Sequence, residues 1–218
     1  MKSHATVSIA PVCFAALALA ALVADPLAAQ YGRQGEGRLG VPWENNRFRL
    51  TQISVEPGAP LPARGDQVLV YLTADPDGRM PAEAVWQSAG ASAVVNRGPA
   101  RLEAIAIELK DTRGAGGGTP GEALDGQYGV NVAPLVDNDR VLVVKQRYDP
   151  LAYGGPLHAH GDDVLVVYLR GGYTWPLADF WGATRVRRGE VDAIPANTLH
   201  RLGNAGGDPL ELLVIVPK

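Results

Sequence analysis

The stretch GEVDAIPANTLHRLGN, residues 189–204, decides the fold of this chain. It sets Gly189, Pro195, His200 and Asn204 at fixed distances from one another. Asn197 stands two residues after the proline, and asparagine is the usual substitute for glycine where a turn needs a positive φ. The pattern predicts a turn from Pro195 to Asn197 that brings His200 in on a second strand.

Two further histidines stand in the stretch GGPLHAHGDDVLVVYLRGG, residues 154–172. His158 and His160 are two residues apart, so on a strand both side chains point to the same face. The chain has 4 histidines, and the remaining one, His4, lies in a segment that we expect to be removed. Because neutral imidazole is a common protein ligand for Zn, Fe, Cu and Ni, the pair predicts half of a metal site.

The two stretches resemble the two motifs of the cupin family. The second motif is matched at Gly189, Pro195, His200 and Asn204, with Asn197 in place of its inner glycine, and the first at His158, His160 and Gly171 or Gly172. The resemblance implies an all-β fold, a double-stranded β-helix or jelly-roll barrel. It also implies one divalent metal ion, either Fe, Mn, Ni or Zn, held by the three histidines.

The acidic ligand of the first motif is where this sequence departs from the family. The family position, four or five residues after the second histidine, holds Val164 or Leu165 in this chain. Only Asp162 and Asp163 are close. Asp162 has the strand parity of the histidines, whereas Asp163 is nearer to the family position and needs a β-bulge. The site is therefore three histidines with water, or three histidines with Asp163, or the aspartates are turn residues that face solvent.

The chain contains the same kind of unit twice. Three blocks recur in the same order: residues 46–58 with 139–151, 65–72 with 161–169, and 96–110 with 204–218. Each block is a short β-rich run bounded by Gly, Pro, Asn or Asp. The repeat predicts a bicupin, with cupin-like units at 40–110 and 139–218 that turn apolar faces inward. Residues 111–138 are predicted to be a glycine-rich linker followed by a strap or edge strand.

The N-terminal unit is predicted to bind no metal. Pro62 and Arg64 stand where the first motif has its two histidines, and Ser92 or Ala93 stands where the second motif has its own. We therefore expect this unit to serve the structure, by packing against the other half or by covering its site.

Composition and the N-terminus limit the classes of function. The formal charge is −3, and this mildly acidic balance gives no indication of nucleic acid or an anionic membrane surface as a partner. Residues 1–29 combine Lys2, a short apolar run and small residues before Gln30, the layout of a secretory signal peptide. Cleavage after Ala29 removes Cys13, so the mature protein, expected in the periplasm or secreted, has no thiolate ligand.

Two functions of different classes follow from the resemblance. Cupins include dioxygenases, isomerases and decarboxylases, so the first is a metal-dependent enzyme, dioxygenase- or isomerase-like, that acts on a small molecule. The second is a non-catalytic periplasmic cupin that binds a small ligand or a metal. No residue is assigned a catalytic role. The expected partner is a small molecule, a homodimer is allowed, and no membrane contact is expected after signal cleavage.

Overall fold

The computed structural model describes residues 43–62, 65–73, 84–110, 129–153, 157–175 and 183–218. Within these ranges every regular element is a β-strand, which confirms the predicted all-β class. No helix in the same ranges is long and apolar enough to cross a membrane. The predicted signal peptide, most of the predicted linker and Arg64 lie outside the described residues.

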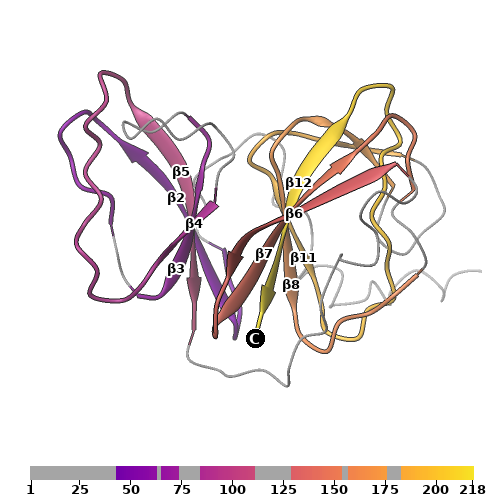
Figure 1. Cartoon of the computed structure of the whole chain (residues 1–218), viewed down its shortest axis with the longest axis horizontal. Helices are drawn as coiled ribbons and strands as arrows, with labels where there is room; N and C mark the ends of the chain where they lie inside the picture. Colours follow the sequence, from indigo (N-terminus) through magenta and orange to yellow (C-terminus); the bar gives the residue numbers. More distant parts are fainter. Residues whose placement is uncertain (1–42, 63–64, 74–83, 111–128, 154–156, 176–182) are drawn as a thin grey trace, which may run out of the picture. The chain divides into compact units, whose positions relative to one another are not determined.

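The strands form two five-stranded antiparallel sheets and one two-stranded ribbon (Figure 1). The first sheet has the order β1-β2-β5-β3-β4, and its strands are β1 (Trp43–Glu44), β2 (Phe48–Val55), β3 (Gln67–Tyr71), β4 (Ala84–Gln87) and β5 (Leu102–Leu109). The second has the order β11-β8-β12-β7-β6, and its strands are β6 (Val130–Asp137), β7 (Val141–Tyr148), β8 (Val164–Tyr168), β11 (Val191–Ile194) and β12 (Leu210–Pro217). The ribbon pairs β9 (Gly172–Thr174) with β10 (Thr184–Val186).

The two sheets are built on the same plan, as the sequence repeat predicts. The order β1-β2-β5-β3-β4 corresponds strand for strand to β6-β7-β12-β8-β11. The pairing register agrees as well: Val68 lies opposite Ile107 in the first sheet, and their counterparts Leu165 and Ile215 lie opposite each other in the second. Strand β6 is an edge of the second sheet, so the strap predicted ahead of that unit is an edge strand.

Asn204 of the second motif and its counterpart Asn96 make equivalent hydrogen bonds. Asn204 Nδ2 donates to the carbonyl oxygens of Asp149 and Asp208, at 3.0 and 2.7 Å. Asn96 Nδ2 makes two similar bonds in the first half, to the carbonyl oxygens of Val55 and Ala100, both at 2.9 Å. Both side chains are almost fully buried. The asparagine of this motif therefore ties the turn before the last strand of each sheet to the end of an earlier strand, which is a folding role.

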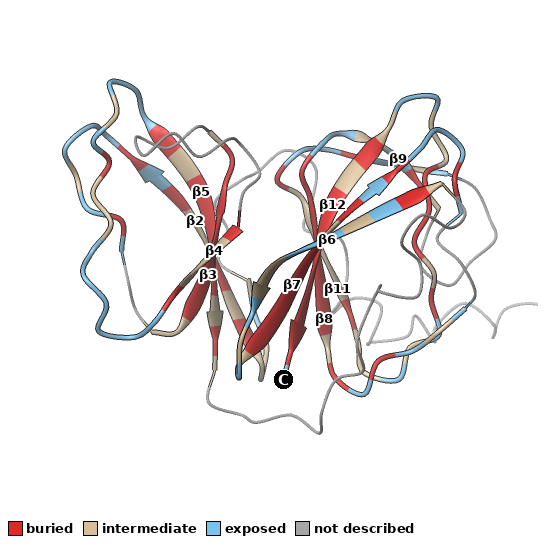
Figure 2. Ribbon diagram, in the orientation of Figure 1, coloured by how far each residue is buried: buried red, intermediate tan, exposed pale blue. Residues whose placement is uncertain are grey.

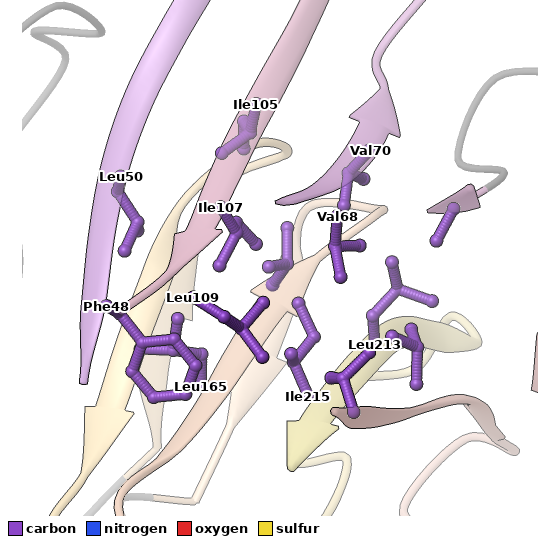
Figure 3. Close-up of a cluster of buried hydrophobic side chains, with 14 of the residues drawn as sticks. Phe48, Leu50, Val68, Val70, Ile105, Ile107, Leu109, Leu165, Leu213 and Ile215 are labelled. Atoms are coloured by element: carbon purple, nitrogen blue, oxygen red, sulfur yellow. The ribbon is translucent and has the colours of Figure 1, made fainter. Parts of the chain in front are cut away.

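One face of each sheet contributes to a shared hydrophobic cluster that joins the two halves (Figure 3). Equivalent positions of the repeat both belong to this cluster, for example Leu50 and its counterpart Val143, and Ile107 and its counterpart Ile215. The other face of each sheet packs inside its own half, around Tyr71 in the first and Tyr168 in the second. The inner strands β3 and β8 are buried along their whole length, whereas the edge strand β6 is mostly intermediate or exposed (Figure 2).

Two ion pairs connect the halves reciprocally. Arg47 contacts Asp162, with Nε 3.1 Å from Oδ1, and both side chains are only 12% exposed. Arg140, the counterpart of Arg47, contacts Asp66, the counterpart of Asp162, at 3.0 Å. Each half thus gives an arginine to the aspartate of the other, and packing between halves, one of the two roles expected for the N-terminal unit, is present.

Leu151 offers a direct test of backbone strain, because it has a φ of 59° where its counterpart Gly58 has a φ of 82°. A left-handed φ destabilises a residue that has a Cβ by roughly 1–2 kcal/mol. Glycine avoids this cost, but it loses more conformational entropy on folding, which offsets part of the gain. Leu151→Gly should therefore raise the free energy of unfolding by about 0.5–1 kcal/mol. The reverse change, Gly58→Ala, should lower the free energy of unfolding by about 1 kcal/mol, the cost of the left-handed φ. No steric clash adds to this cost, because no atom lies within 4 Å of the added Cβ. Urea denaturation measures both, and two changes of the same sign would contradict this account.

Candidate metal centre

A short antiparallel pairing outside the main sheets brings His158 and His200 together. The backbone N–H of each donates to the carbonyl oxygen of the other, at 3.0 and 2.8 Å. His160 follows two residues later, and its carbonyl oxygen accepts a hydrogen bond of 2.7 Å from Asn197 N. Both motifs are thus fixed to each other by backbone hydrogen bonds next to the histidine side chains.

The turn before His200 has the predicted conformation. Asn197 has a φ of 61°, the left-handed region for which asparagine replaces glycine at low cost. Thr198 N donates to Pro195 O at 3.1 Å, which closes the turn. The substitution of asparagine for the inner glycine of the motif therefore preserves the local backbone.

The three imidazoles form a compact cluster. Their ring centroids are 4.4 Å apart for His158 and His200, 5.0 Å for His160 and His200, and 5.1 Å for His158 and His160. One ring nitrogen of each lies within 4.8 Å of the other two. Among the described residues, no other group of three or more His, Cys, Asp or Glu side chains meets this criterion. The sequence prediction that these histidines converge is therefore matched by the geometry.

Burial favours the neutral, metal-binding form of His160 and His200, because it lowers the pKa of both. Burial, and to a smaller extent the neighbouring His200 and His158, lowers the pKa of His160 to about 4, and burial also lowers the pKa of His200. His200 Nδ1 lies 2.8 Å from the carbonyl oxygen of Thr198. Because a carbonyl oxygen only accepts, Nδ1 carries the hydrogen and Nε2 presents a lone pair. The imidazole set therefore fits a divalent ion that accepts nitrogen ligands.

The lowered pKa of His160 predicts that acid destabilises the metal-free protein. The unfolded chain takes up a proton near pH 6.5 and the folded chain only near pH 4. Between these values the unfolded state binds more protons, so the free energy of unfolding falls as the pH falls through this window. Between about pH 7 and about pH 5 the His160 contribution is about 2 kcal/mol. Urea denaturation should show a smaller loss for His160→Asn than for wild type, and equal losses would contradict the prediction.

Both carboxylate oxygens of Asp163 accept hydrogen bonds from groups other than the three histidines. Oδ2 accepts a hydrogen bond from Asn45 Nδ2 at 2.7 Å, and Oδ1 accepts one from Ala196 N at 2.9 Å. Asn45 belongs to the first half of the chain, and Ala196 to the turn that precedes His200. The structure therefore does not bring Asp163 into the histidine group. Its side chain connects Asn45 of the first half to the turn that precedes His200.

Asp162 also lies outside the histidine group, and its carboxylate forms an ion pair with Arg47. It is buried against Arg47, so the interpretation of this residue as a turn residue facing solvent is wrong. Val164 and Leu165, the two residues that stand at the acidic position of the motif, are both fully buried apolar side chains. This chain therefore has an apolar side chain at the motif position where the resemblance implies a carboxylate.

Asp192 is not a defining residue of either motif, and the sequence did not single it out. Asp192 on β11 lies opposite Val166 on β8, and residues directly opposite on paired strands share a face. Tyr168, on the same interior face, donates its hydroxyl to Asp192 Oδ2 at 2.8 Å. The alternation of Asp192 with the buried Ile194 could have indicated this placement. The pair is a hydrogen-bonded acid and phenol inside the half that carries the histidines.

Aromatic side chains contact residues 201–203, which follow His200 in the chain. Tyr153 pairs with Gly203 through an isolated β-bridge, and its ring stacks on Trp175 with centroids 4.3 Å apart. The guanidinium of Arg201 lies 5.1 Å from the centre of the Tyr153 ring. Trp175 thus packs across strands, and these contacts hold the backbone that continues from His200.

No family model matches this sequence, and no curated protein matches it. Solved structures do match. The salicylate 1,2-dioxygenase of Pseudoaminobacter salicylatoxidans, solved in a mutant form, is 8% identical over 78% of this chain and 70% of its own, with a TM-score of 0.54. The oxalate decarboxylase of Bacillus subtilis, studied for its Mn(II) centres, is 12% identical over 78% and 68%, with a TM-score of 0.52. A cupin 2 conserved barrel domain protein from Leptotrichia buccalis is 16% identical over 82% and 88%, with a TM-score of 0.49. At these identities the likeness concerns the fold.

Proposed function

This chain has the cupin fold, and from that premise we propose that it binds one divalent metal ion through His158, His160 and His200. The observation that carries the proposal is the convergence of three imidazoles from two separate segments, with His160 and His200 buried. The proposed ligand set excludes Asp163, because both of its oxygens accept hydrogen bonds from other groups. The remaining position that the family uses, Val164 or Leu165, holds an apolar side chain.

The donor set narrows the choice of ion. Imidazole suits Fe, Ni and Zn, whereas Mn is better served by carboxylate and water. A site of three histidines without a carboxylate therefore favours Fe, Ni or Zn over Mn. When bound, an ion with three protein ligands supplies open coordination positions for water, dioxygen or a small substrate.

The residues around the proposed site have distinct tasks. The Thr198 carbonyl oxygen fixes the His200 ring so that Nε2 points away from the turn. Val164 and Ile194 make the neighbouring interior apolar and exclude water. The Tyr168 hydroxyl and the Asp192 carboxylate can hold or pass a proton between them on the interior face. We propose on this basis a metal-dependent enzyme, dioxygenase- or isomerase-like, that acts on a small molecule.

A non-catalytic periplasmic binding protein is the second candidate. It is favoured by the engagement of Asp162 and Asp163 in structural contacts, which leaves neither as a general base beside the histidines. Water-proton relaxation separates the two, with Mn(II) added in excess as a paramagnetic probe because the site is expected to bind it more weakly than Fe, Ni or Zn: an open site enhances relaxation through exchanging water, and a closed site does not. Oxygen uptake by the Fe(II)-loaded protein with a panel of small organic acids then tests for dioxygenase activity.

The placement of the protein in the cell and the limits of its units are also proposals. We propose that residues 1–29 are removed on export, so that the mature chain begins near Gln30 in the periplasm or outside the cell. We further propose that 40–110 and 139–218 are two cupin-like units in the sense of a bicupin. The matching strand orders and the reciprocal ion pairs support this division.

Replacing Asp163 with asparagine should leave metal binding within about threefold of wild type while lowering stability by about 1–3 kcal/mol, the cost of an unsatisfied buried partner. The loss of stability follows because Asn45 Nδ2 then faces an amide or must reorient. Asn45→Ala is the control: it removes the same hydrogen bond from a residue that is not a candidate ligand, and it should be the more destabilising change because Arg47 N and Phe48 N also lose their acceptor, Asn45 Oδ1. A drop in metal affinity of about tenfold or more in Asp163→Asn alone would make Asp163 a fourth ligand.

A further inference from the structure

Asp192 places a carboxylate on an interior face of the half that carries the histidines, and packing does not require it there. Asp192 lies opposite Val166 in the second sheet, just as Val85 lies opposite Leu69, the counterpart of Val166, in the first. A valine therefore fills the position of Asp192 in the half without histidines. Because a carboxylate that faces an apolar interior is costly, its presence at this position indicates a role other than packing.

The histidines and Asp192 face the same interior. Val166 packs in one buried cluster with Ile194 and Leu202. Leu202 follows His200 by two residues, so an extended backbone gives the two side chains the same face. Asp192 in turn shares the face of Val166, which it lies directly opposite. A molecule held at the proposed metal centre therefore lies in the interior into which the Asp192 carboxylate also points.

The Asp192 carboxylate is accessible and can accept hydrogen bonds. Asp192 and His158 are half-buried, whereas Val166 and Tyr168, next to Asp192 in the interior, are buried. Asp192 Oδ2 accepts a hydrogen bond of 2.8 Å from the Tyr168 hydroxyl. An ionised carboxylate has about four lone-pair sites, so Asp192 can accept further hydrogen bonds from a ligand.

The charge of the proposed metal centre follows from its donor set. Imidazoles bind as neutral ligands, and the motif position of the carboxylate holds Val164 or Leu165. A divalent ion at three neutral imidazoles keeps both of its positive charges and attracts an anionic oxygen group to its open positions. Asp192, by contrast, repels anions and attracts groups that donate hydrogen bonds. A ligand that satisfies both requirements carries an acid group and, apart from it, a hydroxyl or ammonium group.

We propose that the second half binds a small organic acid whose carboxylate is held at the proposed metal centre and whose hydroxyl or ammonium group donates to Asp192. This inference rests on the proposed function and names the class of its ligand. Asp192 is then the residue that determines specificity, and Tyr168 is a positioning residue that holds the Asp192 carboxylate through its hydroxyl.

Calorimetric titration of the zinc-loaded mature protein tests the proposal with three series of acids. The first is propionate, butyrate and valerate, the second adds a terminal hydroxyl to each, and the third adds a terminal ammonium. The chain lengths vary the span between the acid and the donor. At least one hydroxy or amino acid should bind about tenfold or more tightly than the unsubstituted acid of the same length. Asp192→Val should reduce this advantage to about twofold or less, because the acceptor is gone.

Tyr71→Phe is the matched control, because Tyr71 is the counterpart of Tyr168 at the end of β3 and lies in the half without histidines. This variant should keep the full advantage. Asp192→Val leaves the Tyr168 hydroxyl facing an apolar side chain. If that variant does not fold, Asp192→Val combined with Tyr168→Phe replaces it, since phenylalanine needs no acceptor.

Equal binding of the three series by the wild type would overturn the proposal, and so would an advantage that survives the loss of Asp192 in a folded, zinc-loaded variant. Zinc content measured on the same samples separates this inference from the proposed function. Zinc bound without any preference for a donor group overturns this inference alone. Wild-type protein that binds no zinc overturns the proposed function and, with it, this inference.

Discussion

Replacing His200 with alanine is expected to weaken metal binding by about a hundredfold or more, because even the loss of a supporting group around a metal costs about 10–100-fold. His200 is the ligand that the second motif supplies, and it is 1% exposed. Without it, His158 and His160 remain as two single-nitrogen ligands that compete poorly with water. Competition with a chromophoric chelator measures the affinity.

Leu199→Ala is the matched control for this experiment. The side chain of Leu199 is 60% exposed, so its removal leaves the cluster and the turn in place. We expect metal affinity within about twofold of wild type. Circular dichroism of both metal-free variants checks that the fold is kept. Equal affinities in wild type and in a folded His200→Ala would exclude this histidine as a ligand.

Removing Arg47 should be the most destabilising single change among the charged residues, with a loss of about 3–5 kcal/mol in the free energy of unfolding. The change leaves the Asp162 carboxylate buried without its cation, and Asp162 Oδ2 already has no hydrogen-bond partner among the described residues. Replacing both members by apolar residues, Arg47→Met with Asp162→Leu, should recover most of this loss because no unpaired charge remains.

The second ion pair provides an internal comparison. Arg140 and Asp66 make the equivalent contact, but their side chains are 31% and 24% exposed. Solvent screens this pair, so Arg140→Ala should cost about 1 kcal/mol or less. Urea denaturation at neutral pH measures all the variants. If Arg47→Ala and Arg140→Ala had equal effects, burial would not be the reason for the strength of the first pair.

Local features of the fold were predictable because they depend on neighbouring residues. The positive φ of Asn197 follows from its place two residues after Pro195, and the repeat of Asn96 and Asn204 indicates the duplicated plan of the sheets. Strand alternation does not tell which apolar face packs within a half and which joins the halves. The shared cluster around Ile107 and Ile215 therefore emerges only in three dimensions.

The candidate site also combines features that the sequence could predict with features that it could not. Spacing and residue type marked His158, His160 and His200, because ligand geometry restricts both. The role of Asp163 was not predictable, since its partner Asn45 lies 118 residues away in the chain.

Anomalous diffraction from crystals of the mature protein, grown without chelator and supplied with Fe(II), Ni(II) or Zn(II), tests the central claim most directly. The account predicts a single strong peak about 2.0–2.2 Å from one ring nitrogen each of His158, His160 and His200, with the remaining ligands supplied by water. Asp163 should still accept the hydrogen bond of Asn45. The absence of a peak among the three rings, or a peak held by other residues, would contradict the account.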